Sequence, residues 1–235
     1  MQFSFKRVNA IFIKDWKDLQ RNSYVIFTLA IPLMLAAFIG RIGEGNGDLS
    51  TLPINISLVI AGAFIQAAMV AEEKEKNTLR GLLLSPANTV EIFVGKSALS
   101  AIMTVLVISG SILLSEYKVP SPLLFTASVL LGLIFYIAVG TILGLLSRTV
   151  METSIIGMPV LFIFGMSSMF KPMIENEVIL KIINYLPNEQ LDTIWVGLGN
   201  GESFSRITEN ILILMIWVVI SVVATIVIYK KRRID

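Results

Sequence analysis

The residues that could do chemistry are concentrated in one stretch, residues 72–96, which reads EEKEKNTLRGLLLSPANTVEIFVGK. It carries eight charged residues and lies between two long apolar runs. The pattern predicts two short amphipathic helices that break at Ser85 and Pro86, because the residue before a proline avoids helical geometry. Asn88, followed three residues later by Glu91, predicts a capping box at the start of the second helix. We expect a structured elbow on one membrane surface; a solvated loop is the alternative.

The residue types exclude several kinds of enzyme site. The chain has no histidine and no cysteine, which excludes disulfides, thiolate sites, histidine-dependent zinc sites and Ser-His-Asp triads. The long apolar runs contain no charged residue, which excludes intramembrane aspartyl proteases and argues against proton coupling within the chain. Gln66, Thr104, Tyr136 and Thr141 add polarity to these runs, and we expect them to satisfy neighbouring backbone and helices. We therefore expect no catalytic residue, no metal and no cofactor bound by this chain.

Two short glycine motifs resemble known functional or packing patterns. Gly95, Lys96 and Ser97 resemble the end of a phosphate-binding loop, but that pattern needs a glycine at position 90, which is Val90 here. We reject it as a nucleotide site. Gly140 and Gly144 have the spacing that lets membrane helices approach closely. Packing within one subunit and dimerisation both explain that spacing.

The composition is that of a membrane protein. Of 235 residues, 55% are hydrophobic and 15% are charged, whereas soluble domains carry about a quarter charged residues. A net charge of +2 is too small to indicate nucleic-acid binding. The fold class expected is all-α, a polytopic membrane protein with six transmembrane helices, since a bilayer core needs about 20 apolar residues. The apolar runs are residues 24–39, 54–71, 97–115, 123–147, 154–170 and 211–229. Pro32 and Pro159 are expected to kink the first and fifth.

The Lys and Arg residues predict the orientation of these spans. Of 19 such residues, only Arg41, Lys118, Lys171, Lys181 and Arg206 fall on the side opposite the N-terminus. Cytoplasmic loops carry the excess of Lys and Arg. We expect a multi-pass protein of the cell membrane with both termini and the 72–96 elbow in the cytoplasm.

Residues 3–21 predict an amphipathic helix before the first span. Its apolar residues follow steps of three and four, which places them in one stripe, and basic residues fall largely opposite. A helix of this kind lies in the membrane interface; a charged extension that only sets topology is the alternative. The stripe consists of Phe5, Val8, Phe12, Trp16 and Leu19.

The longest external segment, residues 171–210, is not a plain loop. Residues 178–185 and 191–198 are apolar and are separated by Leu186, Pro187, Asn188 and Glu189. The pattern predicts two short helices that dip into the outer leaflet or lie on it, and a partly ordered loop is the alternative. The absence of repeats and linkers indicates one domain, 1–235, comprising an interfacial helix at 1–22, the segment 72–96, the external region 171–210 and the spans between them.

The elbow resembles a known family. Its Glu73, Glu75, Thr78 and Leu79, then Leu83, Leu84, Ser85 and Pro86, then Gly95 and Lys96, are similar to the cytoplasmic segment between the second and third spans of the type 2 ABC transporter permeases. The similarity extends over the whole chain, including Leu186 and Pro187. The chain departs from the family at Asn77, where Gly is usual, and at Asn88 and Thr89, where a Ser-Arg pair is common.

This resemblance implies a half-transporter without its own ATPase. A second permease copy or a sibling permease would complete twelve spans in the lipid bilayer, and a separate ABC ATP-binding subunit would hold ATP and Mg. The cargo expected is an amphipathic small molecule, antibiotic or peptide. The expected activity is therefore efflux, and the expected phenotype is antibiotic resistance. A membrane scaffold or immunity protein that does not transport is the alternative. The residues that the resemblance implies in ATPase docking are Glu73, Glu75, Thr78, Leu79, Leu83, Ser85 and Pro86.

Overall fold

The computed structural model of the chain describes residues 3–42, 49–76 and 88–232, and every regular element in these ranges is helical. The elements are α1 (Phe5–Arg21), α2 (Ser23–Ile42), α3 (Leu52–Ser57), the π-helix η2 (Leu58–Phe64), α4 (Ile65–Glu75), α6 (Thr89–Leu114), α7 (Pro122–Leu146), α8 (Val150–Phe170), the 3-10 turn η3 (Lys171–Met173), α9 (Glu177–Asn184), α10 (Pro187–Gly199) and α11 (Phe204–Arg232).

Six helices of the described chain are long and apolar enough to cross a membrane, which confirms the six predicted spans. α3, η2 and α4 form the second of them as one continuous rod over Leu52–Glu75. Pro32 and Pro159 lie inside α2 and α8, and both helices continue through them. Helix α7 matches its predicted apolar run to within one residue at each end, whereas the other five spans begin or end several residues beyond theirs.

The α3–η2–α4 rod is the centre of the bundle. It is the most buried of the six spans, and small residues such as Ala61, Ala63 and Ala67 are fully buried in it. On α7, a Cβ atom at Gly140 would lie 2.2 Å from the carbonyl oxygen of Ala63, and one at Gly144 would lie 2.6 Å from that of Ala67. Both glycines therefore serve the close approach of α7 to the rod within one chain. The π-helical turns of the rod were not predicted.

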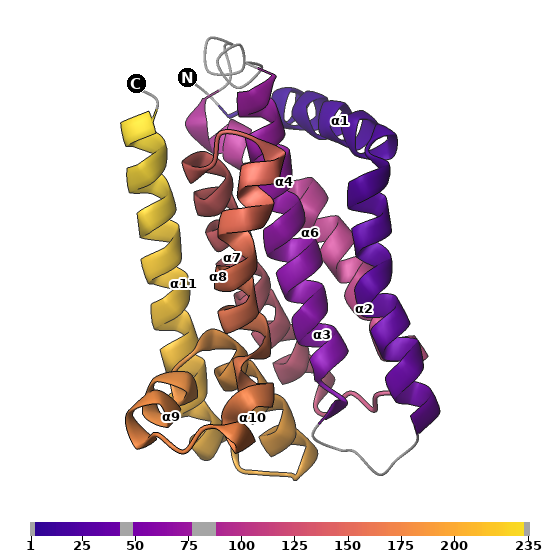
Figure 1. Cartoon of the computed structure of the whole chain (residues 1–235), viewed down its shortest axis with the longest axis vertical. Coiled ribbons are helices and arrows are strands. Elements are labelled where there is room, and N and C mark those ends of the chain that lie inside the picture. The colour runs from indigo at the N-terminus through magenta and orange to yellow at the C-terminus, as the bar shows by residue number, and fades with distance from the viewer. Residues whose placement is uncertain (1–2, 43–48, 77–87, 233–235) are drawn as a thin grey trace.

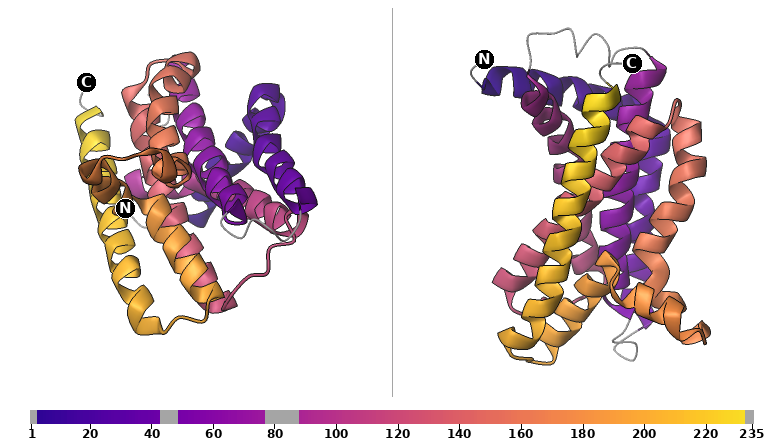
Figure 2. Two further views of the ribbon diagram at one scale, coloured as in Figure 1. Left: turned by 60° about the horizontal axis from the view of Figure 1, so that its bottom comes forward. Right: turned by 90° about the vertical axis from the view of Figure 1, so that its left-hand side faces the viewer.

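The two ends of the bundle differ (Figure 1). α1 lies across one end, where α4 and α11 also finish, and α9 and α10 cover the other end. The views in Figure 2 show the same division, with α11 running along the side of the bundle. We call these the α1 end and the α10 end.

The predicted apolar stripe of α1 is divided in the structure. Leu19 is buried and packs with Val25, while Phe5 is 81% exposed and Trp16 is 38% exposed. Val8 and Phe12 are half-buried. The face that meets the bundle instead runs through Ile11, Asp15 and Leu19, and Ile11 sits where a Cβ at Gly95 of α6 would clash at 2.9 Å. A membrane-interface position for the exposed face stays a prediction.

The two predicted external helices are present as α9 and α10. Most of α9 is exposed, whereas α10 buries Leu191, Ile194 and Trp195 completely. The Trp195 indole Nε1 donates a hydrogen bond of 2.8 Å to the Ser128 hydroxyl of α7. α10 is thus part of the core, which explains why the segment is ordered without forming a span of its own.

Candidate functional site

The elbow is only partly covered by the described residues. Glu73 and Glu75 lie in the last turns of α4, and Asn88 precedes α6. Thr78, Leu79, Leu83, Ser85 and Pro86 lie outside the described residues, and their docking role stays a prediction. The candidate site is therefore described through the groups that anchor the two ends of the segment.

Four charged side chains from three helices meet at the first anchor. Glu73 of α4 forms ion pairs with Lys14 of α1 and with Lys96 of α6, the latter at 2.5 Å. Asp15 of α1 lies 3.3 Å from the Lys14 ammonium and 3.7 Å from that of Lys96. Asp15, Glu73 and Lys96 are buried. We call these four residues the charge cluster; its two carboxylates balance its two ammonium groups.

The cluster shifts the ionisation of its members on α1. Burial raises the pKa of Asp15, and the nearby lysines offset part of that rise. Burial lowers the pKa of Lys14, but its hydrogen bond to Glu73 and the attraction of both carboxylates outweigh this and raise it overall. The two ammonium groups therefore favour the charged form of the buried Asp15 carboxylate.

The second anchor is the start of α6. Asn88 accepts a hydrogen bond of 2.8 Å from the Glu91 backbone N–H, and Glu91 accepts one of 2.9 Å from the Asn88 backbone N–H, which confirms the predicted capping box. Glu91 also accepts two hydrogen bonds from Arg7, of 2.8 and 2.6 Å, and one from the Ser4 backbone N–H. One carboxylate thus caps α6 and holds α1 in place.

The last turn of α4 also joins α7 to α8. Lys74 donates hydrogen bonds to the backbone carbonyls of Leu145, at 2.6 Å, and Ser147. Glu75 accepts a hydrogen bond of 3.1 Å from the Val150 backbone N–H at the start of α8. A cation at a helix C-terminus and an anion at a helix N-terminus are both favourable placements. The start of the elbow is thus bonded to α1, α6, α7 and α8.

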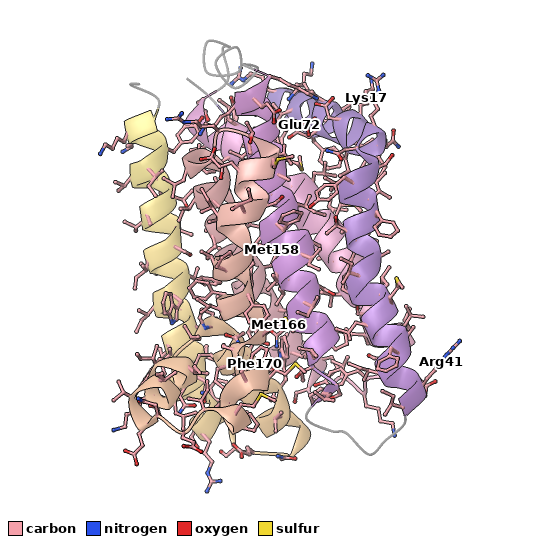
Figure 3. All side chains as sticks on the ribbon, in the orientation of Figure 1. Lys17, Arg41, Glu72, Met158, Met166 and Phe170 are labelled. Atoms are coloured by element: carbon pink, nitrogen blue, oxygen red, sulfur yellow. The ribbon has the colours of Figure 1, made fainter. Side chains whose placement is uncertain are left out.

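An apolar groove of about 280 Å³ lies between α2, the α3–η2 part of the rod, and α8. Phe27, Val59, Phe64, Met158 and Phe162 are among its walls. Met158 and Met166 follow one another along α8 in Figure 3. The groove has almost no polar surface, so it suits an apolar group.

Gln66, Thr104, Tyr136 and Thr141 within the spans hydrogen-bond to neighbouring side chains and backbone, as predicted. Gln66 donates to the Thr141 hydroxyl at 3.0 Å and accepts from Ser100 at 2.7 Å, and all three side chains are buried. Thr104 donates to the Ser100 carbonyl, and Tyr136 donates to that of Phe164. Among the described residues, no group of His, Cys, Asp and Glu could hold a metal ion.

Sequence reasoning missed Arg7, Lys14, Asp15 and Lys96 as members of this site. Arg7 and Lys14 bond to residues 84 and 59 positions later in the chain, and Lys96 lies 23 residues from its partner Glu73. Helical periodicity gives no information on contacts at these ranges. The only available signal was the number of charges in residues 72–96 beside apolar runs without any.

The comparison with protein families agrees with this architecture. A family model described as "ABC-2 family transporter protein" matches residues 50–227, which span the rod, α6, α7, α8, the external helices and most of α11. No curated protein matches the chain. With six apolar spans and a match over more than half of its length, the chain belongs to the ABC-2 type family of transporter permeases.

Proposed function

We propose that the chain is the membrane subunit of an ATP-driven exporter, powered by a separate ATP-binding subunit that docks at the α1 end. The observation that carries this proposal is the last turn of α4, which begins the elbow and is bonded to four other elements. A force applied to the elbow would reach α1, α6, α7 and α8 together.

In this proposal the residues of the elbow divide into two roles. Thr78, Leu79, Leu83, Ser85 and Pro86 contact the ATPase, while Glu73 and Glu75 hold the base of the elbow against the bundle. ATP binding brings two ATPase subunits together and favours one of two arrangements of the spans. The α1 end then faces the cytoplasm, in agreement with its excess of Lys and Arg.

The cargo in this proposal is an amphipathic small molecule, antibiotic or peptide. The groove between α2, the rod and α8 is apolar and offers a surface for the apolar part of such a molecule. Because the groove has no wall on its outer side in a single chain, a second permease with its own α2 and α8 turned towards this one would enclose it.

A pull-down tests the proposal. The tagged chain is purified from its host in mild detergent, and the copurifying proteins are identified and assayed for ATP hydrolysis. We expect a soluble ATP-binding subunit, which is lost when Leu79→Asp is introduced and retained with Lys181→Asp, a control at the α10 end. Recovery of the chain alone, without nucleotide hydrolysis, would contradict the proposal and favour a scaffold or immunity protein.

A further inference from the structure

A second cavity, of about 520 Å³, lies at the α10 end, and it is more polar than the groove. The rod, α8, η3 and α10 contribute to its wall. The charged side chains that line it are three carboxylates and one ammonium group: Asp192, Glu189, Glu202 and Lys171. Lys171 is ion-paired with Glu189, so the cavity keeps an excess of negative charge.

Asp192 is held in position by hydrogen bonds from several neighbouring side chains. The Asn55 side chain of α3 donates a hydrogen bond of 2.7 Å to its Oδ1 atom, and the hydroxyl groups of Thr51 and Ser168 also hydrogen-bond to it. These donors come from α8 and from α3 with its N-cap residue Thr51, none of them from α10 itself. A carboxylate has about four acceptor positions, so three donors do not saturate it.

The surroundings of Asp192 leave its charge poorly solvated. Burial raises the pKa of Asp192 to about 6, and the hydrogen bonds from Thr51, Ser168 and Asn55 lower it only in part. The Asn55 Oδ1 atom is also buried and has no hydrogen-bond partner among the described residues. A cationic group in the cavity would stabilise the ionised form of Asp192, which burial disfavours.

The cavity continues the apolar groove along the same two helices. On the rod, Leu52 lines the cavity, and Ile56 and Ile60 line the groove at successive steps of four residues. On α8, Met166 lines the groove and Met169 lines the cavity. Steps of three and four keep residues on one helix face, so both hollows lie on the same seam, about 6 Å apart along the rod.

We propose that this seam binds an amphipathic cation, with its apolar body in the groove and its cationic group against Asp192. The inference rests on the proposed function for its physiological meaning, since it names the class of cargo, but binding itself needs only this chain. An anion of the same shape would meet the excess negative charge of the cavity, and a neutral molecule would lack the attraction to Asp192.

Two ions of matched shape test the proposal. Tetraphenylphosphonium and tetraphenylborate differ in the sign of their charge, and neither titrates near neutral pH. Equilibrium dialysis of each radiolabelled ion against the purified chain in detergent, with empty micelles as the blank, measures saturable binding. We expect tetraphenylphosphonium to bind, Asp192→Asn to weaken it at least tenfold, and Glu175→Gln, an exposed carboxylate at the same end, to leave it unchanged.

The pH dependence of tetraphenylphosphonium binding by the wild-type chain is a second test. It does not require that the Asp192→Asn variant folds. Tetraphenylphosphonium affinity should fall as the pH decreases from 7.5 to 5, because protonation removes the Asp192 charge. The titratable groups that face Asp192 are Glu189, Glu202, Lys171, Tyr117 and Tyr136. Only a group with a pKa near 6 produces a midpoint in this window, so a flat profile would overturn the proposal.

Other outcomes are equally decisive. Equal binding of the two ions, or unchanged tetraphenylphosphonium binding by folded Asp192→Asn, would overturn the assignment of Asp192. Cation binding by a chain that recovers no ATPase would keep this site and reject the exporter. Recovery of an ATPase without cation binding would keep the exporter and reject this site.

Discussion

Lys96 shows how one residue acquires a different role once its neighbours are known. Beside Gly95 it resembles part of a nucleotide-binding loop, yet its ammonium group is buried between Glu73 of α4 and Asp15 of α1. A buried ion pair contributes little net stability, because desolvation offsets attraction, but loss of one partner leaves a buried charge without compensation. The charge cluster therefore favours one particular placement of α1 on the bundle.

Replacement of Lys96 tests that role. Lys96→Met should destabilise the chain by about 3 kcal/mol, since Lys14 alone cannot balance both carboxylates. The measurement is thermal unfolding in detergent, with Lys17→Met on the exposed side of α1 as the matched control. Lys17 is labelled at the α1 end in Figure 3. The double variant Asp15→Asn with Lys96→Met should recover part of the loss, and no recovery would argue against charge imbalance as the cause.

Asp192 predicts a dependence of stability on pH. Its pKa is about 6 in the folded chain, above its ordinary value of 3.8, so the fold favours the protonated form. That contribution to the free energy of unfolding is fully present below pH 3.8 and is lost as the pH rises through 6. Asp192→Asn should therefore melt at a higher temperature than the wild type at pH 8, with a smaller difference at pH 5. A variant that melts lower at pH 8 would show that the ionised carboxylate stabilises the fold.

At the scale of elements, the close contact between α7 and the rod depends on two glycines, which have no side chain. Gly140 and Gly144 let the α7 backbone lie against Ala63 and Ala67. Since a methyl group at Gly140 would meet a carbonyl oxygen at 2.2 Å, the helices would have to separate.

Gly140→Ala should lower the unfolding free energy by about 2 kcal/mol or more, as expected for overpacking. Gly157→Ala in α8 is the matched control, because its Cβ would make only an ordinary contact of 3.7 Å with Leu143. Thermal unfolding of both variants in one detergent gives the comparison. Equal melting temperatures would mean that α7 moves away from the rod at little cost.

At the scale of the whole molecule, the proposed second permease would cover the groove between α2, the rod and α8. Its outer side is open, and Met158 and Phe162 on α8 are exposed. A second copy that closes the groove would bring the α8 helices of both chains near one another.

The absence of cysteine makes this arrangement easy to test. Met158→Cys should give a disulfide-linked dimer under mild oxidation in membranes, whereas Val223→Cys on the exposed side of α11 should stay monomeric. Non-reducing electrophoresis measures both. Cross-linking through α11 instead of α8 would place the second copy against α11 and leave the groove uncovered.

The sequence by itself determined the six spans, the α1 helix, the capping box at Asn88 and Glu91, and the two external helices. Each of these follows from local rules, since apolar length, helical periodicity and capping act within a few residues of the chain. The family resemblance also needed only local motifs, and the match over residues 50–227 confirmed it.

Only the tertiary structure decided which residues meet. It turned Ile11 and Asp15 of α1 towards the bundle, left Phe5 exposed, and buried Glu73 beside Lys96. It also placed Asn55 against Asp192, 137 residues later in the chain. The physical reason is that charge pairing and helix packing depend on how whole helices are arranged. Six similar apolar segments can pack against one another in many orders, and local sequence patterns do not distinguish these orders.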